Sequence, residues 1–422
     1  MPKINQNKDK IRRFISSNRA LISNYISLIV LQGANYILPL IILPFLVRVL
    51  GTDKFGLVMF AQSLCIFLTV LVDFGFNLSG TREISLARED KSKMSEIFLA
   101  IMFIKTVLII LAFLLLFIVV MVFDRFTKDY EVYLLSFGLV IGQAIFPVWF
   151  FQGIEKMKFV TIVNVLAKII FTVLVVLFVN SESEYIEVPI YNSLGFISSG
   201  ILGLIISLKY IAYKPPSLKL IRQLFKETSS LFVSNFATML YTSSNVIILG
   251  LFTNNTVVGV YSSMEKLILA VKNFYTPIYQ ALFPWLSQKQ EEEKIRVVKK
   301  IRPYIIAMGI LITMVILIFS DQILDLIYDN SSISEYSNVF RILSFIAIFS
   351  GLNMLYNALY FPAVKKYKLR MKILVSGGIL NIIISFLLVN LFKIYGTASC
   401  VFITELYLLI LGTYYFKRSL RN

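Results

Sequence analysis

Long apolar runs are the feature that most restricts how this chain can fold. A helix needs about 20 apolar residues to cross the hydrocarbon core of a bilayer. Runs of this length recur along all 422 residues, of which 58% are hydrophobic and only 15% are charged. An average soluble domain carries about 25% charged residues. The chain has too little charge to cover soluble domains, so it is predicted to be an integral membrane protein.

Twelve such runs can be separated along the sequence. Each is expected to be a helix, because backbone groups in lipid must bond within the segment and the alternating pattern of barrel strands is missing. The first run is too long for a signal-peptide core, so we expect it to remain in the protein. The predicted fold is an all-α membrane protein with twelve spanning helices. Their ranges are 21–48, 57–79, 96–122, 131–152, 159–179, 188–209, 228–252, 257–285, 303–320, 338–362, 371–392 and 396–416.

The distribution of Lys and Arg predicts the orientation in the membrane. Cytoplasmic connections carry an excess of these residues. With both ends in the cytoplasm, the N-terminal tail and the even-numbered connections hold about 31 of the 41 basic residues, and the external connections about five. The net charge of +17 then reflects topology, so no nucleic-acid partner is expected. Both termini are predicted to be cytoplasmic.

The chain is predicted to consist of two related halves. A basic amphipathic stretch precedes each set of six spans: the N-terminal tail, and residues 214–226. Both stretches are expected to lie on the inner membrane surface. The turn at 50–56 resembles the turn at 252–259, and weak internal repeats are common in transporters. We predict an N-terminal six-helix bundle over 1–213 and a C-terminal one over 214–422.

Polar residues form a stripe on one face of the first and seventh spans. Gln32 and Asn35 share a face of the first span, and Asn235 and Thr238 occupy the aligned positions of the seventh. Two interpretations stay open. The amides and hydroxyls could bond packed helices to each other, or they could line a wet central cavity between the halves.

Ionisable residues inside the apolar runs are a sharper signal. A charge at mid-bilayer costs about 2.5–3.5 kcal/mol, so such residues usually face a partner or a water-filled path. Local ion pairing that fixes packing is the alternative for each, and Arg341 could also reach the outer interface. Five of the eight are basic, and a net positive interior favours an anionic, phosphate-bearing substrate. The eight are Asp73, Lys105, Lys168, Glu265, Lys266, Lys272, Arg341 and Glu405.

No catalytic or cofactor motif is recognisable in the sequence. The chain has no His, which excludes His-based triads and the common zinc and haem ligand sets. A P-loop glycine pattern and an Asp-rich metal motif are also missing. Cys65 and Cys400 each lie inside an apolar run and are predicted to be buried core residues. We therefore expect a transporter without a metal or cofactor, and not an enzyme.

Four stretches carry a specific resemblance: LPFLVRVLG at 43–51, DFGFNLSGTREIS at 73–85, VGVYSSMEK at 258–266, and YFPA followed by lysines at 360–368. They resemble the Wzx-type O-antigen flippases of the multidrug/oligosaccharidyl-lipid/polysaccharide exporter superfamily. The resemblance covers essentially the whole chain. It implies two six-helix bundles in a V around a central cavity. It also implies alternating-access movement of undecaprenyl-diphosphate-linked oligosaccharide repeat units from the inner to the outer leaflet.

The resemblance further implies a site and partners. Arg48, Asn77 and Arg82 match family motifs near the membrane edges, where loop and helix-end structure is the alternative to substrate contact. The implied partners are the lipid-linked oligosaccharide, membrane lipid, and polysaccharide polymerase and chain-length regulator proteins, all in a bacterial inner membrane. The other polar and acidic residues named above complete the predicted substrate site. The residues expected to hold the diphosphate are Lys168, Lys266, Lys272 and Arg341.

Two other functions stay open. A drug/cation antiporter of the same fold typically carries an acidic residue in its first span, whereas residues 21–48 contain no Asp or Glu. A membrane polysaccharide polymerase or ligase generally presents a large external loop, whereas the longest external connection here is about 17 residues. The lipid II flippases usually have two additional spans and an Arg-Asp pair deep in the first. These departures favour the O-antigen type of flippase.

Overall fold

The computed structural model describes residues 19–420, which form helices and no strands. Eight helical segments of this part of the chain are long and apolar enough to cross a membrane. Cys65 and Cys400 are both buried and unpaired as thiols, as predicted. The all-α membrane fold is therefore confirmed, and the number of twelve spans stays a prediction.

The first group of helices starts with an element that turns back on itself. α2 (Arg19–Asp73) changes direction at Gly51, whose φ of 67° is a conformation that only glycine adopts freely. Two of the predicted spans therefore meet without a loop. The further elements of this group are α3 (Phe76–Leu86), α4 (Lys91–Val122), α5 (Asp124–Thr127), α6 (Tyr130–Ser136), α7 (Gly138–Ile145), α8 (Val148–Gly153), α9 (Met157–Phe178), the 3-10 helix η1 (Glu182–Glu184) and α10 (Glu187–Leu208).

The second group ends with a similar element. α19 (Tyr367–Arg418) changes direction at Lys393, which has a φ of 50°. The preceding elements are α11 (Leu218–Thr242), α12 (Ser244–Phe252), α13 (Asn255–Ser287), α14 (Glu291–Tyr328), α15 (Ser331–Ser334), α16 (Ser337–Ser344), α17 (Ile346–Met354), the π-helix η2 (Leu355–Tyr360) and α18 (Phe361–Ala363).

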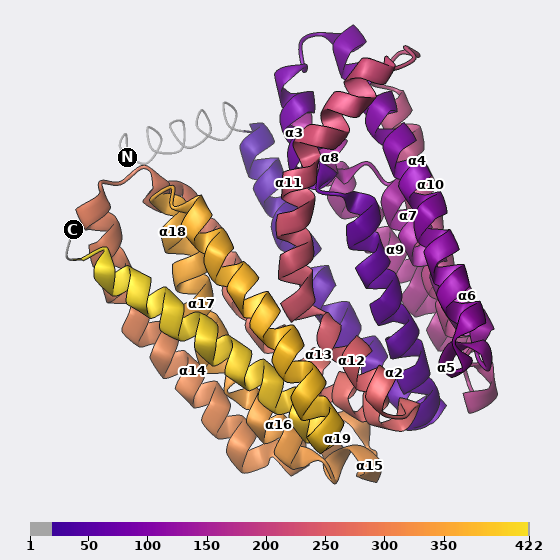
Figure 1. Ribbon diagram of the computed structural model, residues 1–422, viewed down its shortest axis with the longest axis vertical. Coiled ribbons are helices and arrows are strands. Elements are labelled where there is room, and N and C mark those ends of the chain that lie inside the picture. The colour runs from indigo at the N-terminus through magenta and orange to yellow at the C-terminus, as the bar shows by residue number, and fades with distance from the viewer. Residues whose placement is uncertain (1–18, 421–422) are drawn as a thin grey trace, which may run out of the picture.

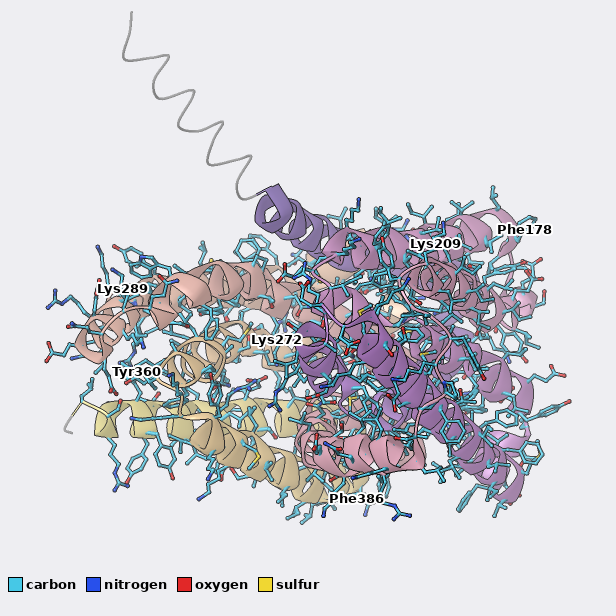
Figure 2. All side chains as sticks on the ribbon, turned by 90° about the horizontal axis from the view of Figure 1, so that it is seen from above. Phe178, Lys209, Lys272, Lys289, Tyr360 and Phe386 are labelled. Carbon is cyan, nitrogen blue, oxygen red and sulfur yellow. The ribbon has the colours of Figure 1, made fainter. Side chains whose placement is uncertain are left out.

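The two groups form a V. Figure 1 shows α2, α12, α13 and the bend of α19 gathered at the lower end, whereas α3 and α18 are separated at the upper end. Viewed from above in Figure 2, the groups lie side by side with Lys272 between them, and Phe178 and Phe386 at the periphery. These two phenylalanines are about half exposed, as expected for side chains that face lipid. This is the arrangement that the resemblance implies.

A turn that occurs in both groups supports the internal repeat. Glu155 after α8 and Lys365 after α18 have φ values of 58° and 57°. In both turns the next residue donates its backbone N–H to the carbonyl five residues earlier, at 2.8 Å. This is the bonding of a helix that ends in a left-handed residue. The same local structure therefore closes corresponding helices of the two groups.

Most of the amphipathic stretch predicted over 214–226 is helical, and its place on the inner membrane surface stays a prediction. It forms the first turns of α11, which starts after the N-cap Ser217. Leu224 is buried, and Phe225 stacks on Phe74 of the first group with 4.5 Å between ring centroids. Leu224 and Phe225 thus contact protein, whereas Leu218 is 81% exposed. Helical periodicity alone does not distinguish contact with protein from contact with lipid. The N-terminal tail predicted to resemble this stretch lies outside the described residues.

Packing between α7 and α10 generates the first testable prediction. A Cβ on Gly200 would lie 2.5 Å from the carbonyl oxygen of Gly142. Gly200→Ala should therefore force the helices apart and lower the free energy of unfolding by about 1–3 kcal/mol, which a lower melting temperature in detergent would report. Gly33→Ala is the control, because a Cβ there meets nothing within 4 Å. Equal melting temperatures for the two variants would contradict this account of the packing.

Candidate functional site

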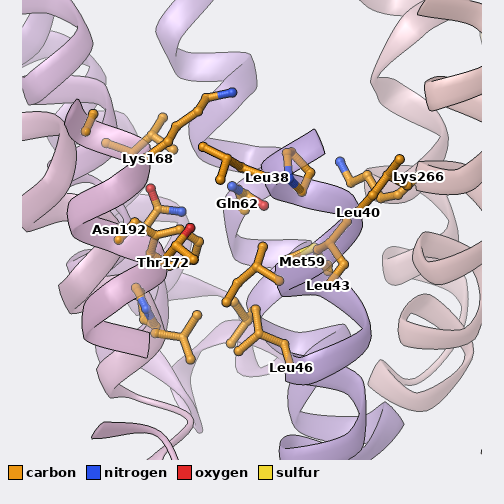
Figure 3. A pocket seen from close by; sticks show the side chains of 18 of the residues that line it. Leu38, Leu40, Leu43, Leu46, Met59, Gln62, Lys168, Thr172, Asn192 and Lys266 are labelled. Atoms are coloured by element: carbon orange, nitrogen blue, oxygen red, sulfur yellow. The ribbon is translucent and has the colours of Figure 1, made fainter. Parts of the chain in front are cut away.

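A cavity of about 320 Å³ lies where the two groups of helices meet. Lys168 of α9 lines it from the first group, and Lys266 of α13 lines it from the second. Figure 3 shows the two lysines on opposite sides of one end of this cavity, and Leu46 at the other end. None of its described lining residues is acidic. Two cations thus face one space whose described wall has no carboxylate, an arrangement that favours an anionic ligand.

The rest of the cavity wall is mixed in polarity. Gln62, Thr172, Asn192 and Asn273 bring amide and hydroxyl groups from α2, α9, α10 and α13. Oδ1 of Asn192 is buried and has no hydrogen-bond partner within the described chain. A buried acceptor of this kind is usually satisfied, and a ligand hydroxyl could supply the donor. Most other lining residues are aliphatic. The wall can therefore contact both polar and apolar parts of one ligand.

A second cavity, of about 300 Å³, lies within the first group and shares Lys168 with the first cavity. Asp73 and Asn77, both predicted from the sequence, line it together with Lys105. Nζ of Lys105 lies 3.4 Å from Oδ1 of Asp73, and the Lys105 side chain is only 4% exposed. Asp73 therefore has a local partner, which supports the packing alternative for both residues of this pair.

A third cavity, of about 240 Å³, lies in the second group and contains Glu265, Lys272 and Glu405. Nζ of Lys272 lies 2.6 Å from Oε1 of Glu405, whose other carboxylate oxygen accepts from Nδ2 of Asn353 at 2.5 Å. A lysine held this closely by a buried carboxylate has its charge balanced locally. The structure thus supports packing rather than a grip on diphosphate for Lys272.

The other predicted residues lie away from the cavity shared by the two groups. Nη2 of Arg341 pairs with Oδ2 of Asp321 at 2.7 Å, and Arg341 does not line any of the three cavities described above. Arg82 is exposed on α3, and Asn235 is half-buried on α11. Arg48 binds the end of another helix through its guanidinium. Direct substrate contact thus receives no geometric support at these positions.

Three residues of the predicted polar stripe cannot be placed. The side chains of Gln32, Asn35 and Thr238 lie outside the described residues, so their position relative to the cavity stays a prediction. Conversely, the sequence pattern missed Asn192 and Gln62. Each is an uncharged polar residue within a predicted span, and neither belongs to the stripe on the first or seventh span. Polarity inside a span was the signal that could have found them.

Solved structures with the same fold indicate the class of protein to which this chain belongs. The fold is shared with a structure described as the inward-facing conformation of a multidrug resistance MATE family transporter of the MOP superfamily, with a TM-score of 0.71 over 90% of this chain and 94% of that one at 11% identity. It is also shared with the lipid II flippase MurJ in an inward closed conformation, with a TM-score of 0.67 over 94% of this chain and 87% of that one at 15% identity. The chain therefore has the fold of these polytopic transporters.

The family follows from the sequence comparison. Residues 21–290 match the family described as "Polysaccharide biosynthesis protein". A curated relative from Escherichia coli (strain K12), "Putative O-antigen transporter", is 30% identical over 411 residues, which cover 95% of each chain. The chain belongs to this polysaccharide biosynthesis family, and the resemblance found in its motifs is confirmed.

The pair of Lys272 and Glu405 generates the second prediction. Lys272→Met or Glu405→Gln alone breaks an ion pair whose carboxylate is buried, which should lower the free energy of unfolding by about 3 kcal/mol, since breaking buried pairs costs about 3–5 kcal/mol. The double variant removes both charges, so its free energy of unfolding should fall by clearly less than the sum of the decreases in the two single variants. Melting curves of the four purified proteins measure this. Additive losses would show that the pair does not fix the packing.

Proposed function

We propose that this protein is a flippase that moves an undecaprenyl-diphosphate-linked oligosaccharide from the cytoplasmic to the periplasmic leaflet of the bacterial inner membrane, for O-antigen or a related surface polysaccharide. The observation that carries the proposal is the cavity lined by Lys168 and Lys266 without an acidic residue in its described wall. Membership of the polysaccharide biosynthesis family and the O-antigen transporter among its relatives support transport over enzymatic synthesis.

The two lysines suit a diphosphate. Each ammonium group offers three donors and binds phosphate as a point charge. The attraction is stronger at a partly buried site than in water because the effective dielectric constant is lower. Lys168 and Lys266 belong to different groups of helices, so an anion between them would also tie the two groups together. The amides of Gln62, Asn192 and Asn273 can bond sugar hydroxyls next to the phosphates.

The proposed orientation follows from the same geometry. The separated ends of the two groups carry the basic segments 82–93 and 365–372, which the positive-inside rule assigns to the cytoplasm. The V would then open toward the leaflet where the lipid-linked unit is made. The halves 1–213 and 214–422 would rock against each other to expose the cavity to the other side. The polymerase and chain-length regulator would act on the unit after its release.

A drug/cation antiporter of the same fold is the alternative. A cationic substrate needs an acidic or aromatic partner to offset its charge. The described wall of the shared cavity holds two lysines and no carboxylate. This wall would repel a cation, so the antiporter is the weaker proposal.

Transport of the lipid-linked unit supplies the third prediction. Lys168→Gln and Lys266→Gln should each lower the flipping rate in proteoliposomes about tenfold or more, because a hydrogen bond to a charged group contributes about 1.5–3 kcal/mol. Arginine at either position should retain more activity than glutamine. Lys158→Gln, an exposed lysine on the same helix as Lys168, is the matched control. Full flipping by both glutamine variants would refute the assigned site, and no flipping by the unaltered protein would refute the function.

The orientation supplies the fourth prediction. Single cysteines replace the exposed residues Ser332 and Lys372 in a Cys65→Ala, Cys400→Ala background. A membrane-impermeant maleimide added to spheroplasts should label Ser332→Cys at once, because this residue lies in the acidic segment 321–337, which the proposed orientation places outside. It should label Lys372→Cys only after the membrane is permeabilised. The reverse labelling pattern would overturn the proposed orientation.

A further inference from the structure

The two groups of helices touch through a reciprocal glycine contact. A Cβ on Gly56 of α2 would overlap the carbonyl oxygen of Asn255, and a Cβ on Gly259 of α13 would overlap the carbonyl oxygen of Thr52. Each glycine therefore lies against the carbonyl of the residue four positions before the other glycine. The contact has approximate twofold symmetry, as expected where two repeats meet. A larger residue at either position would push α2 and α13 apart.

Arg48 makes a second contact between the two groups, at the same end of the V as the glycine contact. Its guanidinium donates to the carbonyl of Ile327 at 2.9 Å and to that of Tyr328 at 3.3 Å. These are among the last carbonyls of α14, which have no partner within their own helix. They also form the negative end of the helix dipole, where a cation is stabilised. Arg48 thus links α2 of the first group to α14 of the second.

Two hydrogen bonds surround the glycine contact. Oγ1 of Thr256 donates to Oδ1 of Asp53 at 3.1 Å, and Nη2 of Arg125 donates to Oδ1 of Asn255 at 2.8 Å. Both bonds join the first group to the second. Figure 1 shows this end of the molecule gathered together, in contrast to the separated ends at α3 and α18. These contacts of α13 and α14 with the first group lie on the side opposite the basic segments, whereas at the other end α11 packs on the first group, where Phe225 stacks on Phe74.

We propose that Gly56, Gly259 and Arg48 form an external latch, which closes the shared cavity toward the outer leaflet and must open before substrate leaves. Both the glycine contact and the Arg48 contact are weak enough to break during a transport cycle. Close glycine contacts gain packing and weak Cα–H···O bonds, and a cation at a helix end is typically worth less than about 1 kcal/mol. Arg48 is a positioning residue, because it is not among the residues lining the cavity. Only the direction of release rests on the proposed function.

The test measures the distance across the latch in the full-length protein without substrate. Spin labels are placed on cysteines at the exposed positions Lys128 and Glu335, one in each group, in the Cys65→Ala, Cys400→Ala background. Double electron–electron resonance should show mainly the short distance of the closed latch. Gly56→Ala and Arg48→Gln should each raise the ratio of long to short distances about fivefold or more, within the usual range of coupling between two states.

Two further variants make the result specific. Gly33→Ala lies in α2 where a Cβ meets nothing within 4 Å, and it should leave the distances unchanged. Arg48→Lys keeps the positive charge at the helix end but loses the paired N–H donors of the guanidinium. Its ratio of long to short distances should therefore lie between those of the unaltered protein and Arg48→Gln. Unchanged distances in Arg48→Gln at a normal melting temperature would overturn the latch, even if Gly56→Ala does not fold. A latch that opens in a protein that flips no lipid-linked oligosaccharide would stand, and the proposed function would fall.

Discussion

The close approach of α2 and α13 is the constraint on which the rest of the structure depends. In a bilayer the lipid tails are as apolar as the helices, so small residues and polar contacts bring helices together. Gly56 and Gly259 allow backbone to meet backbone at one end of the V. The same two helices then contribute Leu46 and Lys266 to the wall of the shared cavity. The position of this helix pair therefore sets the shape of the proposed binding site.

The charged residues inside the helices of the two groups have two kinds of surroundings. Asp73 with Lys105 and Glu405 with Lys272 are ion pairs between helices of one group, and breaking such a pair is costly. They stabilise each group as a unit. Lys168 and Lys266 line a space between the groups that has no acidic residue in its described wall. A binding site formed by two rigid units can change its affinity when the units move, which is what alternating access requires.

The sequence predicted the helices and the class of protein, because hydropathy and the distribution of basic residues depend only on local composition. It also predicted Lys168 and Lys266 as cavity residues. It could not separate them from Lys272, since the carboxylate that pairs with Lys272 lies 133 residues away. For a related reason it could not show that Phe225, at the amphipathic start of α11, stacks on Phe74, a partner distant in sequence. Pairing between distant segments is decided by the fold.

The claim at the centre of this account is that a diphosphate binds between the two groups of helices. A cryo-electron microscopy structure of the protein with an undecaprenyl-diphosphate-linked sugar bound tests it most directly. The account predicts phosphate density between the ammonium groups of Lys168 and Lys266, with the pair of Lys272 and Glu405 intact. Phosphates held by Lys272, with the ion pair broken, or bound outside the shared cavity would contradict it.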